Sequence, residues 1–215
     1  MSTATDISEM KALKKEVAYY MRRLYKRGLT TTFGGNISLK AKDQYFVTAS
    51  QTDKGRMKAS DICVLDRDGR QIGDTLKQSM ETAMHLAIYS VRPDIKAIVH
   101  AHPPVSSSFA VNHQSINTRL TAEAWAVLGE PAMAEYALMG TKNLADIVAS
   151  AARQADVVLM KNHGVLAVGQ TLAEAFDRIE VLENAAKIHL LSQWSGSQKP
   201  LSPAETEAIN QMLKP

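Results

Sequence analysis

Helix-like and strand-like hydrophobic patterns alternate along the whole of this 215-residue sequence. Some segments repeat apolar residues at helical spacing, and short apolar runs bounded by turn residues lie between them. The expected helices are residues 7–27, 79–91, 141–154 and 171–192, with a short helix after Ser202. The expected strands are residues 36–40, 44–47, 61–66, 96–102, 156–160 and 165–168. This interleaving indicates an α/β or α+β fold in which helices cover a sheet, and it leaves the strand order open.

Two of the expected helices begin with the pattern of a capping box, at residues 171–174 and 202–205. In such a box the first hydroxyl accepts a hydrogen bond from the backbone three residues later, and the glutamate carboxylate accepts one from the first residue's N–H. Residues 195–199, between these helices, are the only linker-like stretch, and the sequence contains no repeat. A single domain over residues 1–215 is therefore expected.

The composition is typical of a soluble globular protein, with 45% hydrophobic residues, 22% charged residues and a formal net charge of +3. The basic residues between Lys11 and Lys26 alternate with apolar ones, which is typical of the solvated face of an amphipathic helix. No apolar run approaches the roughly 18 residues that a membrane-spanning helix needs. We therefore expect neither a nucleic acid nor a membrane as a partner.

Cys63 is the only cysteine, so no intrachain disulfide can form, and a cytoplasmic protein is expected. The thiol lies within the apolar run 62–65, and we expect it to pack in the core rather than to act as a nucleophile. The first ten residues are polar and acidic, which argues against a secretory signal.

The sequence Val99-His100-Ala101-His102 lies in an expected strand. Residues i and i+2 of a strand point to one face, so the imidazoles of His100 and His102 project together. Paired imidazoles suit a metal such as zinc, with a third ligand from elsewhere. A His-x-His pair on its own is more often incidental, and both interpretations stay open at this point.

His163 follows an expected buried strand and precedes Gly164, which permits a tight turn. The side chain could point into a site, or it could simply hydrogen-bond to the backbone of the turn.

Glu81 begins an expected helix, with His85 and Tyr89 following on the same helical stripe. The helix dipole favours the ionised form of such a carboxylate, which suits proton transfer beside a metal. We expect His85 to be a hydrogen-bonded, partly buried histidine rather than a ligand.

The segment 30–38 contains Gly34-Gly35-Asn36 flanked by hydroxyl side chains. Such a turn presents backbone N–H groups that can form an anion-binding nest, although it could also be a plain turn.

Taken in order, this glycine–asparagine turn, Glu81, the His-x-His pair and the Asn-His-Gly turn resemble the class II aldolase/adducin family. The resemblance runs from the first helix to about Ser192. It implies a single α/β domain whose central, mainly antiparallel sheet is covered by helices on both faces. It also implies a homotetramer with sites at the subunit interfaces.

The resemblance further implies that a divalent metal, zinc or else manganese or cobalt, is held by three histidines, with Glu81 as the catalytic carboxylate. Glu81 also ligates the metal when no substrate is bound. Aspartate takes this place in related epimerases, so the glutamate favours bond cleavage. Three further residues match positions that contact the phosphate of a small anionic substrate. The implied metal ligands are His100, His102, His163 and Glu81, and the implied phosphate contacts are Asn36, Ser50 and Ser79.

The sequence departs from the family pattern where the phosphate pocket is expected. Phe33, Gln51 and Met80 replace small or hydroxyl-bearing residues. Losing several hydrogen bonds to a charged group, at roughly 1.5–3 kcal/mol each, should weaken phosphate binding. The family's aldolases also use tyrosines as proton donors. None stands at the expected place, where Thr121 lies nearest, and none follows Tyr136.

The expected activity is a metal-dependent aldolase that cleaves a ketose 1-phosphate into dihydroxyacetone phosphate and an aldehyde. A decarboxylase of a keto or hydroxy acid is the alternative, because loss of carbon dioxide also leaves an enediolate and needs no full phosphate pocket. An adducin-like interaction module without chemistry is a third reading, and epimerase or dehydratase chemistry also stays open. Three convergent histidines argue against the interaction module, since a scaffold has no need of them.

Overall fold

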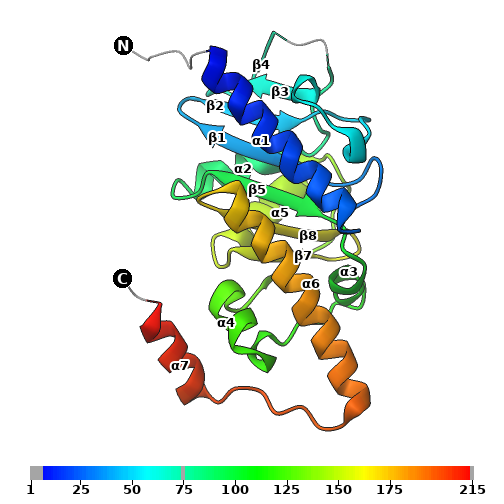
Figure 1. Ribbon diagram of the computed structural model, residues 1–215, viewed down its shortest axis with the longest axis vertical. Helices are drawn as coiled ribbons and strands as arrows, with labels where there is room; N and C mark the ends of the chain where they lie inside the picture. The colour runs from blue at the N-terminus through cyan, green and yellow to red at the C-terminus, as the bar shows by residue number, and fades with distance from the viewer. Residues whose placement is uncertain (1–6, 74–75, 214–215) are drawn as a thin grey trace.

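The protein is described by a computed structural model that covers residues 7–73 and 76–213 (Figure 1). In these residues, eight strands form one sheet in the order β4-β3-β2-β1-β5-β8-β7-β6. The strands are β1 (Asn36–Ala41), β2 (Gln44–Thr48), β3 (Ile62–Leu65), β4 (Gln71–Ile72), β5 (Ala97–Ala101), β6 (Ala132–Ala134), β7 (Val157–Met160) and β8 (Gly164–Gly169). Every neighbouring pair is antiparallel except β6 and β7. The mainly antiparallel sheet expected from the resemblance is confirmed.

Helices cover both faces of this sheet. The helices are α1 (Ile7–Lys26), α2 (Thr82–Val91), α3 (Pro104–Val111), α4 (Ala122–Leu128), α5 (Lys142–Ala152), α6 (Leu172–Ser195) and α7 (Pro203–Met212). Figure 1 shows α1 and α6 in front of the sheet and α2 and α5 behind it. The result is a three-layered α/β domain with a separate apolar core on each side of the sheet.

The two cores follow from the alternation of side chains along each strand. In β5, Val99 packs into the core beneath α1 and α6, whereas Ile98 packs into the core beneath α2 and α5. The same alternation separates Ala167 from Leu166 in β8. His100 has the same parity as Ile98, so its imidazole points toward the α2 side of the sheet.

Most expected elements are present with small shifts of their ends. Helix α2 begins at Thr82 rather than Ser79, with Glu81 as its N-cap residue. Helix α6 continues to Ser195, beyond the expected end at residue 192. The capping box at Ser202 is present in full. At Thr171 only half of the box forms, because the Glu174 carboxylate accepts from the N–H of Gln170 instead of from the cap residue.

Besides three short 3₁₀ helices, the strands β4 and β6 and the helices α3 and α4 were not expected from the sequence. Directly after the expected strand 96–102, Pro104 is the first residue of α3. Proline suits that position because the first N–H groups of a helix have no intrahelical partner. Strand β6 has only three residues, too few to display a period.

The C-terminal helix α7 packs on α4, beside the sheet rather than over it (Figure 1). The indole N–H of Trp125 in α4 donates to the Thr206 carbonyl at 3.2 Å and to Asn210 Oδ1 at 3.0 Å. The expected domain limits at residues 1 and 215 lie outside the described residues. Among those described, no helix is both long and apolar enough to cross a membrane.

Candidate active site

Three histidines converge where β5 and the β7–β8 turn meet. His100 lies in β5, His102 follows that strand, and His163 stands between β7 and β8. The antiparallel pairing of β5 with β8 brings the turn beside the end of β5. One ring nitrogen from each histidine lies within 4.8 Å of the others, so the three imidazoles face one small volume. The sequence prediction that these residues come together is confirmed, although their role as ligands stays a prediction.

The protonation of His100 follows from its surroundings. Its side chain is completely buried, and its Nδ1 lies 2.9 Å from the Val165 carbonyl oxygen. A carbonyl only accepts, so Nδ1 carries the proton and Nε2 presents its lone pair to the site. Burial lowers the pKa of His100, which keeps this ring neutral. Burial together with the neighbouring His100 and His163 also lowers the pKa of His102, to about 3.

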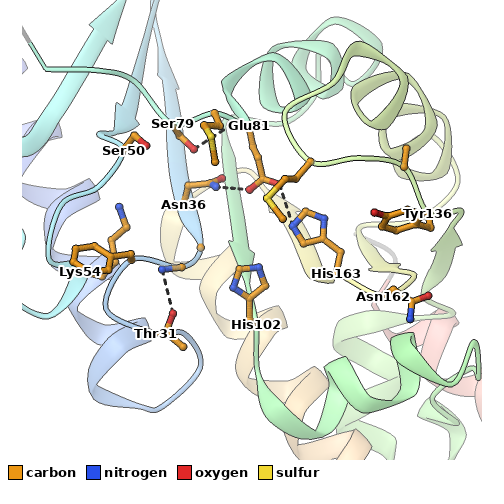
Figure 2. A pocket seen from close by; sticks show the side chains of 16 residues that line it. Thr31, Asn36, Ser50, Lys54, Ser79, Glu81, His102, Tyr136, Asn162 and His163 are labelled. Carbon is orange, nitrogen blue, oxygen red and sulfur yellow. Dashed lines mark hydrogen bonds and ion pairs between the residues drawn. The ribbon is translucent and has the colours of Figure 1, made fainter.

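Glu81 faces the histidine cluster from the N-terminus of α2. One carboxylate oxygen, Oε2, lies 3.3 Å from His100 Nε2. The other, Oε1, lies 3.1 Å from His163 Nε2, a contact drawn in Figure 2. The Asn36 amide donates to Oε2 at 2.7 Å. Burial alone would raise the pKa of Glu81, but the neighbouring His163 ring and the Asn36 amide outweigh it and hold the pKa below its usual range.

Two buried atoms in this cluster have no well-oriented hydrogen bond, namely Glu81 Oε1 and His100 Nε2. The neutral His100 presents a lone pair at Nε2, and the carboxylate offers only lone pairs. Buried acceptors left unpaired in this way are costly. A divalent cation among these groups would satisfy both, and imidazole and carboxylate donors suit zinc. The residues present therefore fit a divalent metal.

A chain of hydrogen bonds supports Glu81 from behind. Asn36 must turn its NH₂ group toward the carboxylate, so its Oδ1 faces His85 Nε2 at 2.6 Å, and that nitrogen must carry the proton. His85 Nδ1 then accepts from the Ser38 hydroxyl at 2.6 Å, and Ser38 in turn lies 2.9 Å from the Tyr89 hydroxyl. His85 is thus hydrogen-bonded rather than a ligand, as expected, but it is fully buried. Its pKa is lowered to about 3, chiefly by burial.

Three glycines allow the backbone to approach the histidines closely. A Cβ on Gly164 would lie 2.5 Å from His102 Cδ2, and one on Gly34 would lie 2.9 Å from His102 Nδ1. A Cβ on Gly35 would lie 2.8 Å from the His100 carbonyl oxygen, and its φ of +66° also favours glycine. A side chain at Gly34 or Gly164 would displace the His102 imidazole, and one at Gly35 would press on the backbone of His100.

A pocket of about 510 Å³ opens in front of the cluster (Figure 2). Asn36, Ser50 and Ser79 all line it, as the resemblance implies. Asn36 is placed by its pairing with His100 between β1 and β5. Ser50 and Ser79 are brought together by an isolated antiparallel bridge between Ala49 and Gln78 and by the bond from Ser50 N–H to the Lys77 carbonyl.

The three residues that depart from the family pattern lie in different places. Phe33 and Met80 line the pocket and are largely exposed. Gln51 is not among the described residues that line it, and its φ of +55° is in the left-handed region, where a side chain is strained. Two of the three substitutions therefore change the wall of the pocket itself.

Lys54 and Tyr136 line the pocket as well, and neither was expected there from the sequence. Tyr136 follows β6, which runs parallel to β7, so it reaches the same edge of the sheet as His163. Because this strand was too short to be expected from the sequence, the position of Tyr136 in the pocket could not be expected either. Thr121, the residue nearest to the expected tyrosine position, caps α4 instead. For Lys54, only its position four residues after Ser50 could have drawn attention to it.

The chain is similar to known proteins over most of its length. The family model of the class II aldolase and adducin N-terminal domain matches residues 15–190. The chain is 36% identical over 179 residues to the L-fuculose phosphate aldolase of Methanocaldococcus jannaschii, which covers 83% of this chain and 96% of that protein. It is 30% identical over 187 residues to the 3-oxo-tetronate 4-phosphate decarboxylase of Haemophilus influenzae, covering 85% and 89%.

A solved L-fuculose 1-phosphate aldolase structure superposes on the chain with a TM-score of 0.85 at 34% sequence identity, covering 94% of this chain and 95% of that one. The sequence match and the shared fold extend over nearly the same residues. By both measures, the chain belongs to the class II aldolase and adducin family.

Proposed function

We propose that this protein is a metal-dependent carbon–carbon lyase that cleaves a ketose 1-phosphate into dihydroxyacetone phosphate and an aldehyde. The observation that carries the proposal is the cluster of His100, His102, His163 and Glu81, all but His100 lining the pocket, with two buried acceptors unpaired. The similarity to an aldolase over most of the chain supports the same reaction class.

His100, His102 and His163 would hold the ion, and Glu81 would join them when no substrate is present. Zinc is the ion we propose, and manganese or cobalt would suit the same donors less specifically. When bound, such an ion supplies Lewis acidity at the substrate carbonyl. Three imidazoles leave room for substrate, which distinguishes a catalytic site from a closed structural one.

The residues of the chain would divide the remaining work. Cleavage breaks the C3–C4 bond of the ketose, the C4 hydroxyl would pass its proton to the ionised Glu81 carboxylate as the aldehyde forms, and the bonding electrons stay on the C1–C3 fragment. Glu81 would deliver the proton that C3 then requires to become a hydroxymethyl group. Its lowered pKa keeps the carboxylate ionised in the resting state, ready to accept a proton first. Asn36, Ser50 and Ser79 would hold the phosphate.

We extend the proposal to a homotetramer in the cytoplasm, with one domain spanning residues 1–215. The lone, buried Cys63 suits a reducing compartment. The exposed apolar side chains of Ile188, Leu191 and Trp194 along the C-terminal end of α6 suit a contact with another subunit.

A decarboxylase is the second candidate, favoured by the similarity to a protein named for decarboxylation of a phosphorylated 3-oxo acid. Loss of carbon dioxide leaves an electron pair on carbon, as cleavage of the C3–C4 bond does, so the same residues would serve. An adducin-like role without chemistry is disfavoured by the unpaired acceptors at the cluster.

Metal analysis and a substrate panel test the proposal. Elemental analysis should find about one divalent ion per chain, lost on replacing His100, His102 or His163 by Ala. The zinc-loaded protein should release dihydroxyacetone phosphate from a ketose 1-phosphate. Release of carbon dioxide from a 3-oxo acid phosphate, without any aldol cleavage, would instead establish the second candidate. A protein that neither contains metal nor is activated by zinc, manganese or cobalt would refute both.

A further inference from the structure

Lys54 is a buried cation in the wall of the pocket. It begins a short 3₁₀ turn, Lys54–Arg56, and only 2% of its surface is exposed. Among the described residues that line the pocket, it is the only lysine or arginine. Lysines are almost never fully buried unless they are paired, because removing an ammonium group from water costs several kcal/mol or more.

The partners of this ammonium group are all neutral. Lys54 Nζ donates to the Ala49 carbonyl at 2.8 Å and to the Thr52 hydroxyl at 3.2 Å. An ammonium group has three N–H donors, so one is left over. No carboxylate in the described part of the chain forms an ion pair with it. Burial lowers the pKa of Lys54 to about 8, and the charge of Asp61 partly offsets this effect, so the group stays mainly charged at neutral pH.

Lys54 lies across the pocket from Glu81 and the histidines. In Figure 2, Lys54 and Ser50 lie on one side of the pocket, Asn36 stands between, and Glu81 and the histidines lie beyond it. A substrate that extends from Glu81 past Asn36 would bring its far end to Lys54. The acceptor that this end must offer is an anionic oxygen.

We propose that Lys54 binds the anionic group of the substrate and so compensates for the hydroxyl groups that Phe33 and Met80 replace. The ligand is a phosphate or carboxylate group at one end of a short polar substrate. This inference rests on the proposed function for the identity of the substrate but not for the anion site itself. The site favours phosphate, because Ser50 and Asn36 can add further donors.

The test compares matched lysine variants of the zinc-loaded protein. Lys54→Met removes the charge and keeps a long side chain, whereas Lys58→Met removes the same charge from an exposed position on the same segment. Calorimetric titration with inorganic phosphate should show binding at least about tenfold weaker in Lys54→Met, the loss expected for one hydrogen bond to a charged group. Lys58→Met should match the unmodified protein within about twofold.

A parallel titration with acetate distinguishes the two kinds of anion. Dependence on Lys54 for acetate but not for phosphate would assign the site to a carboxylate. The proposal would be overturned if the unmodified and Lys54→Met proteins bound each anion with equal affinity. It would also be overturned if Lys58→Met lost as much phosphate affinity as Lys54→Met. Should Lys54→Met fail to fold, Lys54→Gln keeps a donor for the Ala49 carbonyl and takes its place. Failure of both to fold would make Lys54 a structural residue and refute the proposal.

Steady-state kinetics on the same proteins separates this inference from the proposed function. With a ketose 1-phosphate, Lys54→Met should raise KM at least about tenfold and change kcat by less than about threefold. Cleavage by Lys54→Met with an unchanged KM would support the proposed lyase activity and refute the role of Lys54 in anion binding. Phosphate binding that depends on Lys54, without any cleavage by the unmodified enzyme, would support the anion site and refute the proposed lyase activity.

Discussion

At the scale of single residues, the hydrogen bonds of the site converge on the carboxylate of Glu81. Asn36 fixes one oxygen, and the Ser38–His85 pair fixes Asn36. The carboxylate therefore cannot rotate freely, and its position beside the histidines depends on Ser38 and His85, which do not line the pocket. Preorganisation of this kind keeps a proton-transfer group within reach of the reacting carbon.

Replacing Glu81 by Gln should abolish proton transfer while preserving shape. We expect turnover to fall about 100-fold or more, the usual scale for loss of a general acid–base group. Metal content and thermal stability should remain near those of the unmodified protein, because the three histidines are untouched. Steady-state turnover and elemental analysis check this outcome, and full activity in the variant would reassign the proton shuttle.

Ser79→Ala tests the phosphate contact. We expect KM for a phosphorylated substrate to rise more than kcat falls, the pattern for lost uniform binding. Because the Ser79 hydroxyl also accepts from Glu81 N–H at 3.3 Å, a modest fall in kcat should accompany it. Kinetics with a phosphorylated substrate and its dephosphorylated counterpart measure the effect. Equal kcat/KM for the two substrates in the unmodified enzyme would remove the sugar-phosphate assignment.

His85 should make the stability of the metal-free protein depend on pH. Its pKa is about 3 in the folded state and about 6.5 in the unfolded state, so only the unfolded chain gains a proton between these values. The stabilisation is present above pH 6.5 and is lost as the pH falls, by about 2 kcal/mol from pH 7 to pH 5. Urea unfolding at both pH values, compared with His85→Gln, measures it. An identical pH dependence in the variant would contradict the assignment.

At the scale of elements, periodicity located the long helices and the central strands, but it could not locate short elements fixed by tertiary contacts. Strand β6 exists because it pairs with β7, and α3 exists because a proline at its start needs no hydrogen-bond partner. The site shows the same division. The histidines could be found because His100 and His102 stand two residues apart at the end of one strand, whereas the sequence around Lys54 does not show that the loop buries it.

The β7–β8 turn offers a prediction at this scale. Gly164→Ala would place a Cβ 2.5 Å from His102 Cδ2 and 2.7 Å from the Ala101 carbonyl oxygen. We expect a loss of about 1–3 kcal/mol in the free energy of unfolding and weaker metal binding, because His102 must move. Gly73→Ala is the control for zinc affinity, which it should leave unchanged: no atom lies within 4 Å of the added carbon, and the strain expected from its φ of +83° lies away from the histidines. Chemical unfolding and zinc titration report the two effects, and unchanged zinc affinity in Gly164→Ala would contradict the steric argument.

At the scale of the whole molecule, the pocket is open on the side where Phe33, Met80, Tyr136 and Met139 are exposed. A single chain thus leaves apolar surface around the mouth of its own site. Sites at subunit interfaces, as the family resemblance implies, would cover such a rim. Assembly would then exclude water from the reacting atoms.

The assembly itself can be measured. We expect light scattering after size exclusion to give a mass near four times 23.5 kDa. Trp194→Ser, which removes an exposed aromatic ring from α6, should shift this mass downward at low protein concentration. Tyr19→Ser, on the exposed face of α1, serves as a comparison. A monomeric mass for the unmodified protein would refute the tetramer.

The order of strands in the sheet sets when the site can exist during synthesis. Strand β1 lies beside β5, although β2, β3, β4 and α2 come between them in the chain. A nascent chain that has completed β4 and α2 already holds Asn36 and Glu81 but has none of the three histidines, and the edge of β1 still awaits its partner. Closing that long loop and adding β8 are late events on the ribosome. The proposed uptake of an ion by the histidines would therefore wait until β5, β7 and β8 are in place.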